Sequence, residues 1–125
     1  MKKIYGILGL VGAVLWGAAV LLRGTPIRDY HLIKQLLWVA PNFCVVWIGV
    51  GGVVTLFPLA FKREFNPAHM VWLLGSLLGI LLLSEIVHAL FLNASFDLWD
   101  MLASVTASAV VWGIHCHQKR KGAIP

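Results

Sequence analysis

Six residues of this chain have side chains that could do chemistry. They are Glu85, His88, Asp97, Asp100, Ser104 and Arg28. Five of them fall within residues 85–104, and Arg28 lies far upstream. Carboxylates and an imidazole can hold a metal ion or move a proton, and arginine pairs with carboxylates or phosphates. We interpret these residues as a polar ligand-binding cluster and assign none of them a catalytic or metal-binding role.

Glu85 and His88 are three residues apart in an apolar stretch, so they share one face of a helix. If the stretch crosses a membrane, a charged Glu85 there costs about 2.5–3.5 kcal/mol, which makes the residue a candidate for function. A structural hydrogen bond between helices is the alternative. A Glu-x-x-His pair also supplies two ligands of a di-metal bundle, but that site needs the motif twice. An interhelical hydrogen bond or a proton-linked pair is therefore favoured over a metal site.

Asp97 and Asp100 stand where the N-cap and N3 positions of a following helix are expected. Carboxylates at these positions accept hydrogen bonds from free backbone N–H groups and oppose the helix dipole. Asp100 is also a candidate to point into the bundle beside Glu85. With Ser104 and Ser108 it forms one polar stripe, which fits either a binding groove or ordinary helix packing.

Arg23 and Arg28 precede the second apolar segment. Either of them could pair with the carboxylates of residues 85–100. An arginine among carboxylates at a membrane surface could also bind a phosphate or carboxylate headgroup. Simple anchoring at the membrane interface is the plainer alternative.

The remaining histidines and cysteines carry weaker signals. A haem needs two histidines that face each other, and His88 and His115 are expected at opposite ends of the bundle. Cys44 and Cys116 are expected in opposite halves of the bilayer, which disfavours a disulfide. We find no Gly-rich phosphate loop and no Ser/His/Asp order of catalytic spacing. The sequence therefore favours a non-enzymatic protein without a cofactor.

The elements that position these residues follow from the composition. The chain has 125 residues, of which 60% are hydrophobic and 12% are charged. Soluble domains carry about 25% charged residues, so this chain cannot supply the polar shell of a soluble enzyme. The composition predicts an integral membrane protein of the all-α class. The basic residues lie in short clusters beside apolar runs, which is typical of membrane anchors and not of a nucleic-acid-binding face.

The chain is long enough for one domain of four transmembrane helices with short loops. The expected spans are about 4–22, 36–61, 68–92 and 97–115, and a turn at residues 93–95 joins the last two. We prefer an uncleaved first span to a signal peptide because its apolar run is longer than about 15 residues. The second span exceeds the length that the bilayer requires, so we expect it to tilt or to break near Pro41.

Glycines at helical spacing predict close helix packing. Gly6, Gly9 and Gly12 would let the first helix approach a neighbour. Gly75 and Gly79 form a small-xxx-small pattern in the third span, which predicts a homo-oligomer as one candidate assembly.

Orientation follows from the positive-inside rule. The N-terminus, the second loop and the C-terminus carry seven Lys and Arg residues, and the first loop carries the other three. We therefore expect both termini in the cytoplasm and the first and third loops outside. Trp38 and Trp99 would then lie at the outer interface, and Trp72 and Trp112 at the inner one.

The stretch from Glu85 to Ser104 resembles the VanZ-like family of small bacterial membrane proteins. The matching residues are Glu85 and His88, the run Phe96-Asp97-Leu98-Trp99-Asp100, and Ala103-Ser104 with Ala107. Residues 37–43 look like a Pro-Asn-Phe stretch of some relatives. The family commonly has Gln where His88 stands. The resemblance implies a multi-pass protein of the bacterial cytoplasmic membrane, linked to the cell envelope and to teicoplanin resistance, with no established enzymatic mechanism.

Three functions remain open at this point. The first is a non-enzymatic envelope protein whose outer groove binds a lipid-linked or peptide ligand and alters glycopeptide susceptibility. The second is a small transporter or flippase, although drug exporters of this size carry a carboxylate in the first span and this chain has none there. The third is an accessory subunit of a larger membrane complex.

Overall fold

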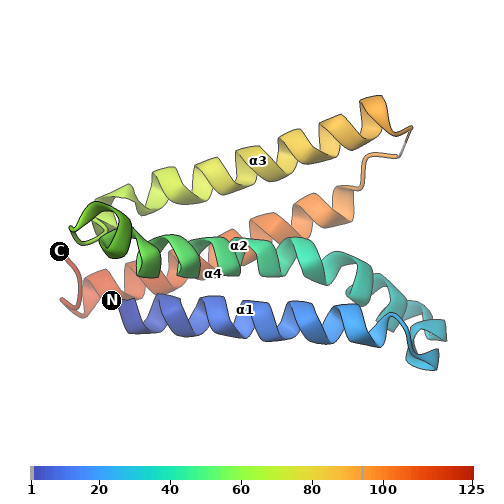
Figure 1. Ribbon diagram of the computed structural model, residues 1–125, viewed down its shortest axis with the longest axis horizontal. Coiled ribbons are helices and arrows are strands. Elements are labelled where there is room, and N and C mark those ends of the chain that lie inside the picture. Colours follow the sequence, from blue (N-terminus) through green and yellow to red (C-terminus); the bar gives the residue numbers. More distant parts are fainter. Residues whose placement is uncertain (1, 94) are drawn as a thin grey trace.

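The computed structural model of the chain describes residues 2–93 and 95–125, and within them it is all-helical (Figure 1). The all-α class predicted from the composition is confirmed. Four long helices follow one another along the chain, with short 3-10 helices before the second and the third. They are α1 (Lys2–Leu22), η1 (Pro26–Asp29), α2 (His31–Phe61), η2 (Pro67–His69), α3 (Met70–Phe91) and α4 (Leu98–Arg120). Ala94, in the predicted turn between the last two helices, lies outside the described residues.

Glycines bring α1 and α2 into close contact. A Cβ atom on Gly9 would lie 2.9 Å from the Cα atom of Gly51, and one on Gly51 would lie 2.7 Å from the carbonyl oxygen of Tyr5. Both distances are shorter than a carbon atom tolerates, so the two backbones can meet only where both residues lack a side chain. The predicted packing role of Gly9 in the first helix is confirmed, and α2 is its partner.

α2 is longer than the predicted span and contains two prolines. It begins at His31, so the loop predicted over residues 23–35 is largely replaced by η1 and by the first turns of α2. Pro41 lies inside the helix without ending it. In Figure 1 the N-terminal part of α2, coloured teal to blue, changes direction relative to the rest of the helix. A bend there is expected, because proline cannot donate to the carbonyl four residues earlier.

α4 packs mainly against α2 through a face of small residues. Ala103, Ser104, Ala107 and Ser108 are buried on this face. The indole Nε1 of Trp47 donates to the carbonyl of Ala107 at 3.4 Å, which adds a hydrogen bond between the two helices. Small side chains allow this close approach, in which α2 forms the centre of the core.

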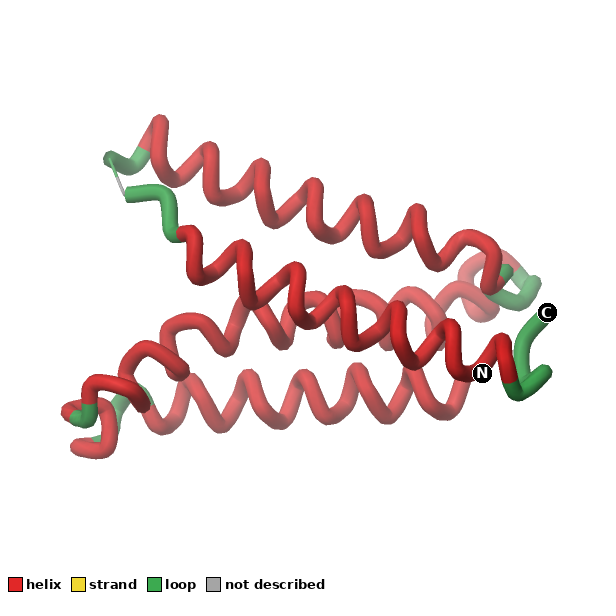
Figure 2. Tube along the Cα trace, turned by 180° about the vertical axis from the view of Figure 1, so that it is seen from behind, coloured by secondary structure: helices red, strands yellow, loops and turns green. Residues whose placement is uncertain are grey.

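α3 is the least buried of the long helices. Only Met70 and Leu74 on it are buried, and its ribbon runs apart from that of α1 in both views (Figures 1 and 2). Among the described residues, no atom lies within 4 Å of a Cβ added to Gly75 or Gly79. The small-residue pattern predicted to mediate packing therefore has no partner within the described chain.

Three helical segments are long and apolar enough to cross a membrane: Lys2–Leu22, His31–Phe61 and Pro67–Phe91. They expose many large apolar side chains, for example Leu21 at 76%, Leu59 at 78% and Phe91 at 77% of their surface. α4 has 23 residues but is more polar and does not belong to this group.

The termini lie at one end of the bundle, together with the connection between α2 and α3 (Figure 1). An ion pair between Lys2 and Glu64 joins two of these segments. α4 ends there at Arg120, and a Schellman cap follows, in which Gly122 has a φ of 68° and the N–H groups of Gly122 and Ala123 bond back to the carbonyls of Lys119 and Gln118. The α1–α2 and α3–α4 connections lie at the other end of the bundle, apart from each other in the view of Figure 2.

Candidate functional site

Asp97 caps α4, as predicted. Its Oδ1 atom accepts a hydrogen bond from the backbone N–H of Trp99 at 2.9 Å, and its backbone is extended as an N-cap requires. The cap fixes where α4 starts and therefore where the side chains of Trp99 and Asp100 point. Asp97 has a structural role whatever else it does.

Asp100 lies in the first turn of α4, and its side chain is partly buried. Its Oδ1 atom is buried and has no hydrogen-bond partner among the described residues. Asp97 and, more weakly, Glu85 add like charges near this carboxyl, while the side chain of Asn42 on α2 and the guanidinium group of Arg23 lie close enough to act on its charge. Asn42 is a neighbour that the sequence reasoning missed, and the placement of Asp100 beside Glu85 stays a prediction.

Glu85 and His88 do not converge on a shared partner. The Oε2 atom of Glu85 is 3.5 Å from the backbone nitrogen of Asp97, which links the end of α3 to the start of α4. The Nδ1 atom of His88 is hydrogen-bonded to the carbonyl of Ser84 at 2.8 Å, within its own helix. Within residues 2–93 and 95–125, no group of three His, Cys, Asp or Glu side chains could hold a metal ion. This arrangement favours the structural interpretation of Glu85.

Ser104 and Ser108 are buried, but their hydroxyl groups bond back to their own helix. Ser104 donates to the carbonyl of Asp100, and Ser108 donates to that of Ser104, both at 2.9 Å. Of the two interpretations of this stripe, the contacts favour helix packing.

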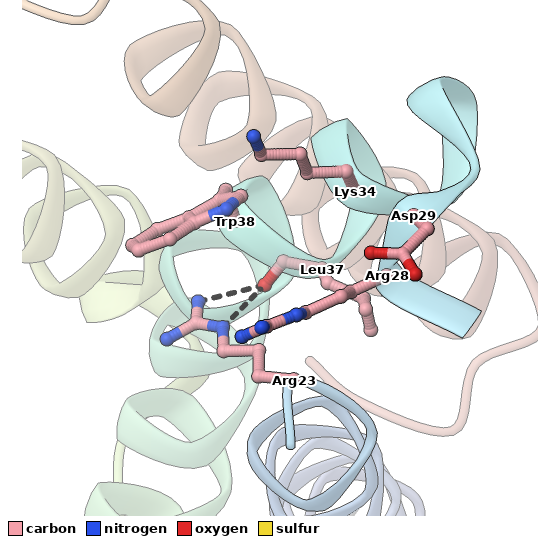
Figure 3. Close-up of a pocket in the computed structure, with 6 residues that line it drawn as sticks. All are labelled: Arg23, Arg28, Asp29, Lys34, Leu37 and Trp38. Carbon is pink, nitrogen blue, oxygen red and sulfur yellow. Dashed lines mark hydrogen bonds between the residues drawn. The ribbon is translucent and has the colours of Figure 1, made fainter. Parts of the chain in front are cut away.

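Arg28 lies apart from this cluster. It lines a cavity of about 620 Å³ at the connection between α1 and α2. The other lining residues are Arg23, Asp29, Lys34, Leu37 and Trp38 (Figure 3). Among the arginines it is Arg23, not Arg28, that lies near the carboxylate of Asp100. No hydrogen bond or ion pair joins Arg28 to Glu85, Asp97 or Asp100 among the described residues, and the α1–α2 connection and the α3–α4 turn lie apart in Figure 2.

Arg23 is held by the backbone of α2. Its Nε and Nη2 atoms donate to the carbonyl oxygen of Leu37 at 3.1 and 2.7 Å, and its guanidinium carbon lies 4.7 Å from the centre of the Trp38 ring (Figure 3). The carbonyl of Leu37 is the one that Pro41 cannot satisfy, because proline has no N–H. Arg23 thus replaces the missing helical donor.

A second cavity lies between the first turns of α2 and the start of α4. Its volume is about 570 Å³, and two indoles from different helices, Trp38 and Trp99, line it together with Asp97 and Lys34. The remaining lining residues are His31, Leu32, Gln35, Leu36 and Val39. Trp38 and Lys34 also line the first cavity, so the two cavities adjoin. We call the second cavity the tryptophan cleft.

A buried polar pair joins α1 to α4 at the opposite end. The hydroxyl group of Tyr5 and the Nδ1 atom of His115 are 3.2 Å apart, and Trp112 stacks on the imidazole. The sequence reasoning assigned no role to this pair. No local signal could have found it, because 110 positions separate the two residues.

No family model, curated protein or solved structure matches the chain. The resemblance to the VanZ-like family therefore stays a prediction made from the residues alone.

Proposed function

We propose that all four helices span the bacterial cytoplasmic membrane, with both termini in the cytoplasm. α4 is about 35 Å long at 1.5 Å per residue, which is enough to cross a bilayer. It packs against α2, an apolar helix, which it crosses at an angle (Figure 1). A helix packed against membrane helices in this way occupies the same membrane. The end with the termini carries seven of the ten Lys and Arg residues, which supports a cytoplasmic location.

The protein acts as a non-enzymatic, VanZ-like component of the cell envelope that binds an amphipathic ligand at the outer membrane interface. The observation that carries this proposal is the tryptophan cleft. Its indoles and aliphatic side chains suit a lipid or peptide chain, while Asp97 and Lys34 offer polar contacts at the rim. A lipid-linked or peptide ligand of the envelope has this mixed character, and sequestering it would change glycopeptide susceptibility.

Susceptibility to teicoplanin and vancomycin in a Gram-positive host without related proteins tests this function. We expect the wild type to raise resistance, and Trp99→Ala to abolish the effect by removing one wall of the cleft. Trp72→Ala is the matched control, because Trp72 is 75% exposed on α3 and lies outside the cleft. Membrane levels are matched with a C-terminal tag. A well-expressed wild type that leaves both susceptibilities unchanged refutes the proposal.

The exposed face of α3 supports self-association as a second proposal. Gly75 and Gly79 are exposed, and no described atom lies near the positions that their Cβ atoms would occupy. In a bilayer, such a face favours contact with another helix. Cross-linking in native membranes should yield a dimer that Gly79→Ile weakens and Gly17→Ile, on an open part of α1, leaves intact. If both variants form the dimer equally well, this face of α3 is not the dimer interface.

A further inference from the structure

We propose that the cavity at the α1–α2 connection binds a phosphate group, held by the guanidinium groups of Arg23 and Arg28. This inference rests on the proposed function, because it names the chemical class of the amphipathic ligand proposed there. A phosphate seated here would belong to the same molecule whose apolar part occupies the adjoining tryptophan cleft.

The charge of the cavity favours an anion. Three cationic side chains line it, Arg23, Arg28 and Lys34, against one carboxylate, Asp29. None of these cations forms a salt bridge within the described part of the chain. The ion pair found among the described residues joins Lys2 to Glu64, at the end of the bundle that holds the termini. Like charges gathered at the edge of a low-dielectric region repel one another, and a bound anion removes that repulsion.

The geometry favours a phosphate over a simple counter-ion. In Figure 3 the side chain of Arg28 extends towards the guanidinium group of Arg23, so the two planar groups face the same part of the cavity. Guanidinium groups offer paired N–H donors that match two phosphate oxygens. Arginine has five N–H donors, and Arg23 uses those on Nε and Nη2 for Leu37, so donors on its other terminal nitrogen remain for a ligand.

Arg23 is also fixed before any ligand arrives. Its bonds to the carbonyl of Leu37 and its stacking on Trp38 hold a long side chain in one position. A ligand that binds there does not have to order this side chain, which lowers the entropic cost of binding. Arg28 is exposed on η1 and has no such restraint, so it can close on the phosphate from the other side.

The position of the cavity fits the headgroup of a lipid. Trp38 lines both the cationic cavity and the tryptophan cleft. A ligand with a phosphate in the first and an apolar chain in the second would cover this tryptophan. A phospholipid, a lipid-linked phosphate and free phosphate share the recognised group, and the experiment separates the sources.

Binding to the purified full-length protein in neutral detergent tests the inference. The probes are dioctanoyl phosphatidylglycerol, dioctanoylglycerol, which has no phosphate, and inorganic phosphate. Binding is measured by tryptophan fluorescence and by native mass spectrometry. We expect phosphatidylglycerol to bind and dioctanoylglycerol to bind at least about tenfold more weakly, since the charge-assisted hydrogen bonds are lost. If inorganic phosphate competes with phosphatidylglycerol, the phosphate group alone is enough for binding. If inorganic phosphate does not compete, the site recognises the phosphate only as part of a lipid headgroup.

Arg28→Gln should weaken phosphatidylglycerol binding about tenfold or more. The side chain of Arg28 forms no hydrogen bond or salt bridge among the described residues, so we expect this variant to fold, which circular dichroism checks. Arg63→Gln is the matched control, because that arginine lies at the other end of the bundle beside Phe57. Equal binding by the wild type and Arg28→Gln, or equal binding of the two dioctanoyl lipids, overturns the inference. If phosphatidylglycerol binding depends on Arg28 but drug susceptibility never changes, the phosphate site stands and the envelope function fails.

Discussion

The contact between Arg23 and the bend in α2 yields the sharpest prediction. Pro41 leaves the carbonyl oxygen of Leu37 without a helical donor, and Arg23 supplies two N–H groups at 3.1 and 2.7 Å in its place. Arg23→Met keeps most of the aliphatic stem and removes these donors. An unsatisfied carbonyl costs about 1–3 kcal/mol, and the lost stacking of the guanidinium group on Trp38 costs about 0.5–1 kcal/mol. We expect the free energy of unfolding to fall by about 1.5–4 kcal/mol.

The same change should cost less when position 41 can donate a hydrogen bond. In Pro41→Ala the new N–H satisfies the carbonyl of Leu37, so Arg23→Met then removes only the contact with Trp38. The expected cost falls to about 0.5–1 kcal/mol, which gives a coupling energy of about 1–3 kcal/mol between positions 23 and 41. The double-mutant cycle cancels the direct effect of Pro41→Ala on helix stability.

Reversible unfolding in mixed micelles, with sodium dodecyl sulfate as denaturant and far-UV circular dichroism as readout, measures all four free energies. Arg28→Met is the matched control, because it removes a guanidinium group from the same cavity that does not bond to Leu37. We expect it to change stability by less than about 0.5 kcal/mol. Equal costs of Arg23→Met in the wild-type and Pro41→Ala backgrounds would refute the reasoning.

Three further predictions use the same assay. Gly9→Ala should destabilise the protein by about 1–3 kcal/mol, because its Cβ would lie 2.9 Å from a backbone atom of α2, whereas Gly17→Ala, with open space around it, should not; equal effects would contradict the packing of α1 on α2. Tyr5→Phe should cost about 1 kcal/mol by removing the buried hydrogen bond to His115, and a neutral result would show that the pair contributes nothing. Asp97→Ala should cost about 1 kcal/mol and Asp97→Ser much less, since serine also caps helices; similar losses in both would argue against the capping role.

The sequence predicted those features that depend on local pattern. Long apolar runs predicted the helices. The glycines of the first segment predicted close packing, because a residue without a side chain allows another backbone to approach, whichever helix provides it. Asp97 was recognisable as a cap because capping depends only on residues next to it. The partner of the glycine face was not predictable, since Gly9 carries no information about which helix contains Gly51.

The site was harder to predict because its members meet through the folding of a loop. Arg23 and Arg28 are five positions apart, and the sequence alone left either of them open as the partner of the carboxylates. η1 turns the chain between them, so Arg23 reaches Leu37 and the neighbourhood of Asp100 while Arg28 does not. One signal was present: a proline at position 41 frees the carbonyl of residue 37, which then needs a donor from elsewhere. The sequence does not say which cation provides it.

The proline that interrupts the hydrogen bonding of α2 also builds the proposed phosphate site. Pro41 frees the carbonyl of Leu37, that carbonyl holds Arg23, and Arg23 is the fixed half of the guanidinium pair. A Pro41→Ala variant therefore separates stability from binding. The new N–H competes with Arg23 for the carbonyl, so we expect Arg23 to loosen and phosphatidylglycerol to bind several-fold more weakly even where the helix itself becomes more stable. If Pro41→Ala binds phosphatidylglycerol as tightly as the wild type, then the bend does not position Arg23 for binding.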